Sequence, residues 1–474
     1  MSKQVQTQPV FGRTHHIHMV GIGGIGMSGM AEILLQKGYR VTGSDASRGE
    51  SIEHLRKLGA EVFIGHKEEN IEGADVVVYT SAVNAHDNIE TKAALEHGVP
   101  VIKRAEMLAE LMRMKYGIGI AGTHGKTTTT TLTGHVVQDG CFDPTIIVGG
   151  KVHSFSRTNA VVGTGDIIIV EADEFDRTFL RLTPSLAVIT NIEADHLDIY
   201  DNLDDVKEAF VEFANKVPFY GAVVLCLDDP NVRSIIPRID RRIITYGLTP
   251  QAGIRAIDID MDHFYTTFSV LKGEEELGKI RLKAPGEHNV KNALAAIAVG
   301  LELDIDFKLI KSGLERFQGV FRRFQLKTEK DGVTVIDDYA HHPTEVQATL
   351  NAARKGWKDH RIVAVFQPHL YSRTQDLYKE FGLSFFDAEV CVITDVYPSR
   401  EQPIEGVTGK LIADAAKEYG HRQVHYVEDK NELSARLTEL VKPGDVVITM
   451  GAGDIYKYGE QFTEALEAGI EKTN

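Results

Sequence analysis

The stretch that decides the fold is Tyr116-Gly-Ile-Gly-Ile-Ala-Gly-Thr-His-Gly-Lys-Thr-Thr128, an apolar strand that runs into a glycine-containing turn and a threonine-rich helix start. In such a turn, backbone N–H groups surround phosphate oxygens, Lys126 places a charge near the β- and γ-phosphates, and the Thr127 hydroxyl can bind Mg²⁺. Ile120 stands where a strict Walker A sequence has its first glycine, but the flanking strand and helix supply the expected context. The motif predicts a nucleoside triphosphate site formed by Gly122, Thr123, His124, Gly125, Lys126, Thr127 and Thr128.

A run of acidic residues, Glu171-Ala-Asp-Glu174, follows the apolar segment Ile167–Val170. Ligands of α/β sheets bind at the carboxyl ends of the strands, so these acids would face the phosphate loop, with Glu171 as a candidate Mg²⁺ ligand. A solvated acidic turn is the alternative interpretation. His196 follows the next apolar run, Ala187–Thr190, and from its position alone fits a metal ligand or a core residue equally well.

A second glycine-rich turn lies near the N-terminus, where the short strand Ile17–Val20 runs into Gly21-Ile-Gly-Gly-Ile-Gly26. Such a turn brings the backbone close to a pyrophosphate at a helix N-terminus, and an acid after the next strand grips a ribose hydroxyl. The pattern fits NAD, FAD or another nucleoside diphosphate, or a glycine turn with no ligand. His18 alternates along the strand, so we expect it to be structural. The candidate nucleotide contacts are Gly21, Gly23, Gly24, Gly26, Ser44 and Asp45.

The alternation of strand-like and helical segments along the chain is typical of α/β proteins with parallel sheets. A length of 474 residues has room for about three domains. We predict a first domain over residues 1–115, a central ATP-binding domain of the P-loop type with a mostly parallel sheet over 116–322, and a third domain over 323–474.

Composition narrows the classes of function. The formal net charge of −16 argues against a dedicated nucleic-acid binder and against attachment to anionic lipid. The three cysteines lie far apart without a CxxC pair, so we expect neither a disulfide framework nor a cysteine-ligated metal. The N-terminus carries no apolar signal segment, and no apolar run approaches about 18 residues. These features predict a soluble cytoplasmic protein with no membrane partner.

Together the motifs resemble the Mur ligase family. The resemblance covers nearly the whole chain in one order, through HIHMVGIGGIGMSGMA, GTHGKTTTT, EADEFDRTFL, TNIEADHLD, GEHNVKNALAA, GVFRRF, DDYAHHPTE and QPHLYSRT. It is strongest to the members that add L-alanine to UDP-N-acetylmuramate. The resemblance implies a Rossmann-like first domain that binds the UDP-sugar, a central domain that binds MgATP, and a Rossmann-like third domain that closes and binds alanine.

The resemblance also implies roles for single residues. Lys126 and Thr127 would serve the phosphates and Mg²⁺, and Glu171 and His196 would serve the metals, for which Mn²⁺ is a possible substitute. Lys207 lies four residues before the position where sister ligases carry a carbamylated, metal-binding lysine, so no such lysine is expected here. The expected catalytic residues are Lys126, His196, His341 and Arg373.

Further matches lie in the last third of the chain. His288 and Asn292 match adenine contacts, and Arg323 and Asp338 match residues that reach the nucleotide from the closing domain. Clustered His, Tyr and Arg side chains at strand ends suit the orientation of a carboxylate and an amine. The residues on the side from which alanine would attack are Tyr339, His341 and Arg373.

Two positions depart from the common family pattern. Leu370 stands where arginine is frequent, and the segment with Phe175 and Arg177 differs from the usual sequence, so no role is carried onto these residues.

The implied reaction transfers the ATP γ-phosphoryl group to the sugar carboxylate and lets the amine of alanine displace phosphate from the acyl phosphate. Three alternatives stay open at this point. A recycling ligase would add a tripeptide to the same UDP-sugar, an NAD-dependent oxidoreductase would use the first glycine turn alone, and a nucleotide switch would form no amide.

Overall fold

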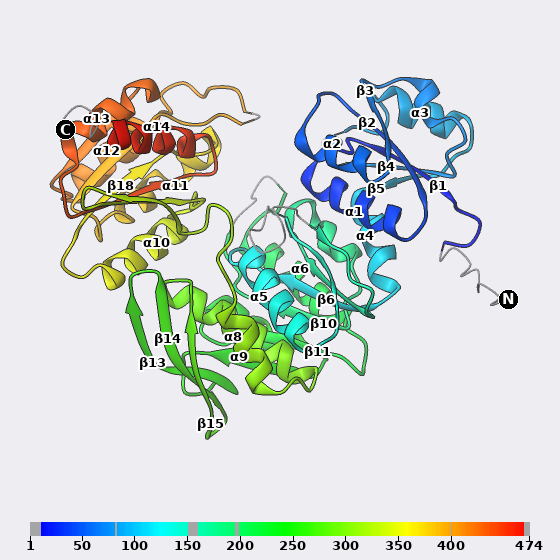
Figure 1. The fold of residues 1–474 in the computed structure, drawn as a ribbon, viewed down its shortest axis with the longest axis horizontal. Helices are drawn as coiled ribbons and strands as arrows, with labels where there is room; N and C mark the ends of the chain where they lie inside the picture. Colours follow the sequence, from blue (N-terminus) through cyan, green and yellow to red (C-terminus); the bar gives the residue numbers. More distant parts are fainter. Residues whose placement is uncertain (1–10, 81–82, 150–159, 195–198, 400, 469–474) are drawn as a thin grey trace. The chain divides into compact units, whose positions relative to one another are not determined.

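The fold is known from a computed structural model (Figure 1), which describes residues 11–80, 83–149, 160–194, 199–399 and 401–468. The strands within these described ranges form three sheets, of five, ten and six strands. The chain is divided into two compact units. The first unit is drawn from Met1–Ala256, Val270–Leu277 and Lys291–Phe317, and the second from Ile257–Ser269, Gly278–Val290 and Gln318–Asn474.

The first sheet is entirely parallel and has the strand order β3-β2-β1-β4-β5. This order reverses between β1 and β4, and at such a switch point the loops at the strand ends leave a crevice for a ligand. The Gly21–Gly26 turn follows β1 and therefore lies at this point. The strands are β1 (His16–Val20), β2 (Arg40–Asp45), β3 (Glu61–Ile64), β4 (Val76–Tyr79) and β5 (Val101–Lys103). The helices are α1 (Ile25–Gln36), α2 (Glu50–Lys57), α3 (Ile89–Glu96) and α4 (Arg104–Arg113).

The second sheet has the order β15-β14-β13-β12-β11-β10-β6-β9-β7-β8. From β13 to β7 the neighbouring strands are parallel, and β8 pairs with β7 in the antiparallel sense. The strands are β6 (Tyr116–Ala121), β7 (Thr145–Ile147), β8 (Ala160–Val161), β9 (Ile167–Glu171), β10 (Leu186–Ile189), β11 (Ala222–Cys226), β12 (Ile243–Gly247), β13 (Ile254–Asp262), β14 (Tyr265–Lys272) and β15 (Glu275–Leu282). The helices are α5 (Lys126–Asp139), α6 (Leu203–Asn215), α7 (Pro230–Ile235), α8 (Glu287–Glu302) and α9 (Phe307–Glu315).

Strands β6, β9, β10 and β11 are apolar and buried on both faces, as strands covered by helices on each side must be. The phosphate loop follows β6, between β9 and β10 in the sheet. The central position of β6 therefore brings the ends of both neighbouring strands to the loop.

The third sheet has the order β16-β17-β21-β18-β19-β20, with only the β16–β17 pair antiparallel. Pro343 occupies the first turn of α10, where its missing N–H costs no hydrogen bond. The strands are β16 (Gln325–Lys330), β17 (Val333–Asp338), β18 (Arg361–Phe366), β19 (Val390–Thr394), β20 (Val424–Val427) and β21 (Asp445–Met450). The helices are α10 (Pro343–Gly356), α11 (Tyr371–Leu383), α12 (Gly409–Glu418), α13 (Leu433–Leu440) and α14 (Ile455–Ala468).

The predicted α/β class and the mostly parallel central sheet are confirmed. The domain bounds at residues 115 and 322 stay predictions. Across the described part of the chain, no helix combines the length and apolar character needed to span a membrane.

Candidate active site

The phosphate loop needs glycine at two positions. Gly122 has φ +136° and packs so closely on β10 that a Cβ would lie 2.0 Å from Thr190 Oγ1. Gly125 has φ +81° and serves as the N-cap of α5. Both backbone angles lie in the region that only glycine adopts without strain. The local sequence thus fixes the loop conformation that leads into α5.

Residues directly after β10 hold the loop in place. Asn191 Oδ1 accepts from the His124 amide at 2.7 Å, and Thr190 Oγ1 donates to the His124 carbonyl at 2.7 Å. The Thr123 hydroxyl accepts from the Glu193 amide at 2.9 Å. Thr123 and His124, predicted phosphate contacts, are therefore positioned by the neighbouring strand end.

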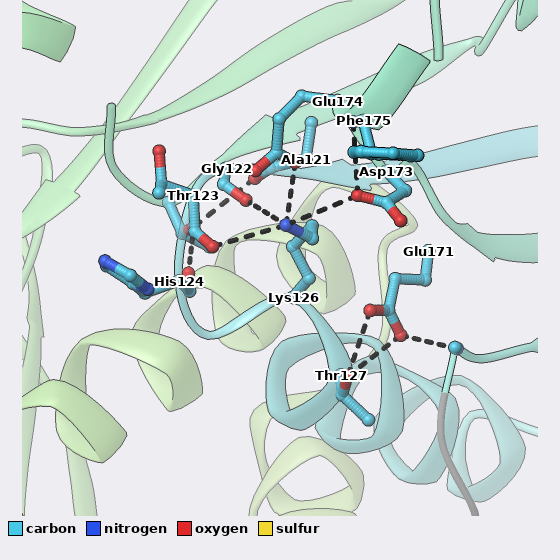
Figure 2. Close-up of polar contacts among 12 residues, drawn as sticks. Ala121, Gly122, Thr123, His124, Lys126, Thr127, Glu171, Asp173, Glu174 and Phe175 are labelled. Carbon is cyan, nitrogen blue, oxygen red and sulfur yellow. Dashed lines mark hydrogen bonds and ion pairs between the residues drawn. The ribbon is translucent and has the colours of Figure 1, made fainter. Parts of the chain in front are cut away.

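Lys126 points across the loop to the acids that follow β9 (Figure 2). Its ammonium donates to the carbonyls of Gly122 at 2.8 Å and Thr123 at 3.2 Å, and to Glu174 Oε2 at 2.7 Å. Asp173 lies at 3.8 Å. The lysine thus links the carbonyls of the loop to the acids that follow β9.

Thr127 and Glu171, both predicted metal ligands, contact each other directly (Figure 2). The Thr127 hydroxyl lies 2.9 and 3.0 Å from the two carboxylate oxygens of Glu171, which also accepts from the Gly149 amide at 2.7 Å. A hydroxyl and a carboxylate so close together supply the oxygen ligands that Mg²⁺ prefers. The pair could therefore hold a divalent cation.

Carboxylates outnumber cations at this edge. Burial raises the pKa of Glu171, and it raises the pKa of Glu174 to about 7 even though Lys126 is adjacent. Burial alone would lower the pKa of Lys126, but Glu174 and Asp173 outweigh it and raise the value. Buried acids that hold protons this tightly are suited to a site that receives positive charge from outside the chain.

Hydrogen bonds to the end of β2 hold the first glycine turn in place. The Gly23 amide donates to Asp45 Oδ2 at 2.9 Å, and the Gly21 amide donates to the Ser44 carbonyl at 2.8 Å. The predicted Ser44 and Asp45 are therefore beside the turn. The Ser44 side chain, however, is fully buried and donates to Glu90 Oε2 at 2.5 Å, so its hydroxyl is committed to the protein.

Glu90 is a buried acid that the sequence did not reveal. It lies in the first turn of α3 and, besides Ser44, accepts from Asn70 Nδ2 at 2.6 Å and contacts His66 Nδ1 at 3.0 Å. His18 Nε2 lies 3.8 Å away, and His18 Nδ1 contacts Thr42 Oγ1 at 2.8 Å. The structural role expected of His18 is confirmed by this buried network.

The second compact unit gathers the predicted amino-acid side. Tyr339 and His341 follow β17, with ring centroids 5.3 Å apart, and His341 Nδ1 lies 3.1 Å from Glu345 Oε2. His369 lies 6.1 Å from the His341 ring and stacks on Tyr397 at 5.8 Å. Sequence analysis named neither His369 nor Tyr397 as a site residue, although His369 lies in the QPHLYSRT segment.

Arg373 lies in the first turn of α11, the helix that begins directly after Leu370. Leu370 adopts φ +70° and ψ 136°, a conformation that strains any residue except glycine. Such strain is typical of functional loops, and it falls at the position where this chain departs from the family pattern.

Arg323 and Asp338 lie close together in the same unit. Asp338 accepts from the amides of Phe324 at 2.7 Å and Ala340 at 2.8 Å, and burial raises its pKa to about 6. Burial alone would lower the pKa of Arg323, but the negative charges of Glu345 and Asp338 outweigh burial and raise the pKa. Both predicted nucleotide contacts are thus held within one charged cluster.

The remaining predicted residues have separate outcomes. Asn292 Oδ1 accepts from Thr129 Oγ1 of α5 at 3.2 Å and would lie 2.6 Å from a Cβ built on Gly125 of the phosphate loop. His288 lies on the part of α8 that belongs to the second unit. His196 lies outside the described residues. Arg177 forms an ion pair with Asp205 and lies 4.9 Å from the Tyr200 ring centroid. The roles of His288, Asn292 and His196 toward ligands stay predictions.

Comparison with known proteins matches three consecutive family descriptions. Residues 16–116 match the Mur ligase family catalytic domain, residues 120–300 the Mur ligase middle domain, and residues 322–453 the Mur ligase glutamate ligase domain. The UDP-N-acetylmuramate–L-alanine ligase of Salinibacter ruber is 56% identical over 98% of this chain and 98% of its own length. The ligase of the same name from Geotalea daltonii is 53% identical over 96% and 99%.

Solved structures agree with these matches. The UDP-N-acetylmuramate–alanine ligase of Thermotoga maritima superimposes with a TM-score of 0.79 at 32% identity, covering 96% of this chain and 99% of that one. A murein peptide ligase from Psychrobacter arcticus shares the fold, with a TM-score of 0.66 at 22% identity over 95% and 98% of the two chains. On this evidence the chain belongs to the Mur ligase family.

Proposed function

We propose that this protein joins L-alanine to the carboxylate of UDP-N-acetylmuramate and converts ATP to ADP and phosphate, a step of peptidoglycan synthesis. The observation that carries the proposal is the phosphate loop facing Glu171 and Glu174, within a chain that is similar over nearly its whole length to alanine-adding ligases. If the protein were an NAD-dependent oxidoreductase, the phosphate loop and the acids beside it would have no function.

The chemistry follows from the charges. A carboxylate is a poor electrophile, and phosphorylation by ATP turns it into an acyl phosphate that an amine can attack. This transfer requires alignment and neutralisation of charge more than covalent help from the protein. The loop amides and Lys126 would bind the β- and γ-phosphates, and Lys126 would move from Glu174 toward the transferring group.

Thr127 and Glu171 would hold Mg²⁺, with His196 as a further ligand carried over from the family. The short Thr127–Glu171 contact and the burial of Glu171 fit a cation at this point. When bound, the ion would neutralise the phosphate oxygens and orient them. Because imidazole is an unusual ligand for Mg²⁺, Mn²⁺ should support the reaction at least as well.

Tyr339, His341 and Arg373 would bind and orient alanine. A guanidinium pairs well with a carboxylate, and a neutral imidazole can take a proton from the ammonium group of alanine, which leaves the amine free to attack. The grouping of Tyr339, His341 and His369 in one cluster supports this assignment.

A product-mass assay tests the proposal. The full chain, MgATP and UDP-N-acetylmuramate are incubated with alanine, glycine, serine or the tripeptide substrate of a recycling ligase. We expect a product with the mass of the alanyl conjugate, together with ADP and phosphate, and no product from UDP-N-acetylglucosamine, which lacks the carboxylate. Ligation of the tripeptide alone would make the protein a recycling ligase, and phosphate release without a conjugate would refute amide formation.

A further inference from the structure

Arg104 is the first residue of α4, a position that does not favour a cation. The helix dipole is positive at its N-terminus, so an arginine there is destabilising unless an anion lies nearby. Within the described residues the Arg104 side chain forms neither an ion pair nor a hydrogen bond. Glu106 shares the first turn of α4, but side chains two positions apart do not face each other on a helix.

The guanidinium instead lies against the first glycine turn. A Cβ built on Gly26 would lie 2.2 Å from Arg104 Nη1, so the guanidinium packs directly on the backbone of Gly26. Gly26 is in the first turn of α1, and its amide donates to no acceptor in the described parts of the chain. A guanidinium and an unpaired amide therefore lie side by side at the start of α1.

These groups open onto a cavity of about 60 Å³ that Gly26 and Arg104 line together with Gly149, Glu171, Asp173 and Thr178. Neither Glu171 nor Asp173 pairs with Arg104. Because Glu171 and Asp173 line the cavity, an anion that enters it would be repelled unless a cation lies nearby. Among the lining residues, Arg104 supplies that positive charge.

We propose that Arg104 binds the diphosphate of the sugar nucleotide. This inference rests on the proposed function and adds a contact that the glycine motif does not contain. A planar guanidinium can donate two parallel hydrogen bonds to phosphate oxygens, and the Gly26 amide adds a third donor. The diphosphate would lie beside the first turn of α1, at the mouth of the cavity that Arg104 and Gly26 line.

Titration of the full-length chain with uridine, UDP and UDP-N-acetylmuramate tests the proposal. A hydrogen-bonded contact to a charged group predicts that Arg104→Gln weakens binding of UDP and of UDP-N-acetylmuramate by the same factor, roughly 10- to 100-fold. Uridine has no phosphate, so its affinity should not change. Arg113→Gln is the matched control, because Arg113 lies at the other end of α4, exposed and paired with Glu110. It should bind all three ligands as the wild type does.

Three results would overturn the proposal. Loss confined to UDP-N-acetylmuramate would place Arg104 on the sugar carboxylate, an equal loss for uridine would show a structural role, and unchanged UDP affinity would exclude the contact. If Arg104→Gln does not fold, the same titrations on Arg104→Lys decide, since lysine keeps the charge and loses the paired donors. UDP affinity equal to wild type in Arg104→Lys would then refute the two-bond contact.

The proposed function fails by a different result. A wild-type chain that binds UDP through Arg104 but forms no alanyl conjugate would refute the function and leave the anion contact standing. A chain that forms the conjugate with equal UDP affinity in wild type and Arg104→Gln would refute only the contact.

Discussion

Lys126 is the residue whose loss should be most costly to the reaction. Its ammonium is preorganised for the transferring phosphoryl group, so Lys126→Ala should lower turnover by at least ~10²-fold, the scale observed when one such donor is deleted. Steady-state phosphate release with saturating substrates measures this effect. Turnover near that of the wild type would contradict the assignment of the ATP site.

The Lys126 experiment needs a control for folding, because the partner Glu174 is only 3% exposed. Removal of the lysine leaves this carboxyl buried without a cation, a situation that generally destabilises a protein. The double variant Lys126→Ala with Glu174→Gln removes both charges. If activity is lost through chemistry, the double variant should fold better than Lys126→Ala and be just as inactive.

His196 and Lys207 provide a paired test of the metal site. Lys207 lies on α6 with its ammonium 3.8 Å from Asp204, an ordinary helical ion pair. We expect Lys207→Ala to be nearly silent, added bicarbonate to have no effect, and His196→Ala to lower turnover severely. Turnover assays with Mg²⁺ and Mn²⁺ measure all three. Rescue of an inactive Lys207→Ala variant by short carboxylic acids would show that a carbamylated lysine operates here.

Sequence reasoning identified residues that stand close to a motif and missed those that the fold brings in. Thr127 and Glu171 were predicted to share a metal, and they are in contact. Glu90 was missed because its partners, such as Ser44 and Asn70, lie 46 and 20 positions away and carry no motif of their own. A buried acid in the first turn of a helix looks like an ordinary capping residue until its surroundings are known.

At the scale of elements, the apolar runs predicted the buried parallel strands well. The predicted segment Ile167–Val170 ends one residue before β9 does, and Ala187–Thr190 is shifted by one residue from β10. The strands β13, β14 and β15 were not predicted, although β13 begins with the alternation of buried and half-buried residues that is typical of a strand with one covered face. Two-residue β8 is too short to leave any periodic pattern.

The junction of α3 with β2 should give the fold a measurable sensitivity to acid. Burial alone would raise the pKa of Glu90, but the adjacent His18 and the hydrogen bonds from Ser44 and Asn70 outweigh it and lower the pKa from 4.5 to about 2. The unfolded state therefore binds this proton more tightly than the folded state does. The carboxylate stabilises the fold above about pH 4.5, and this contribution is lost as the pH falls toward 2.

Glu90→Gln should remove this pH-dependent contribution. The wild type should exceed the variant in free energy of unfolding by up to about 3 kcal/mol near neutral pH, and the difference should shrink as the pH falls from about 5. Urea denaturation at a series of pH values measures it. Glu96→Gln, an exposed change at the end of the same helix, is the control. If the difference in free energy of unfolding between wild type and Glu90→Gln does not vary with pH, the ionisation of Glu90 does not stabilise the fold.

At the scale of the whole molecule, the proposed substrates are divided between the two compact units. The glycine turn and the phosphate loop belong to the first unit, while Tyr339, His341 and Arg373 belong to the second. The α/β class followed from the repeated strand–helix pattern, but the division of α8 between the units did not. A helix of 16 residues with continuous periodicity gives no signal of such a division in its sequence.

This division predicts that binding of the two substrates can be separated by mutation. Arg373→Ala should raise the apparent KM for alanine or lower kcat, because a guanidinium that pairs with the amino-acid carboxylate would be lost. Calorimetric titration with UDP-N-acetylmuramate should give nearly the wild-type affinity, since the proposed contacts of that ligand lie in the first unit. Arg436→Ala is a suitable control, because Arg436 is an exposed arginine of the second unit whose Nη1 pairs with Glu439 at 2.6 Å. A matching loss of UDP-sugar affinity in Arg373→Ala would mean that the first substrate also depends on the second unit, and the assignment of each substrate to one unit would be wrong.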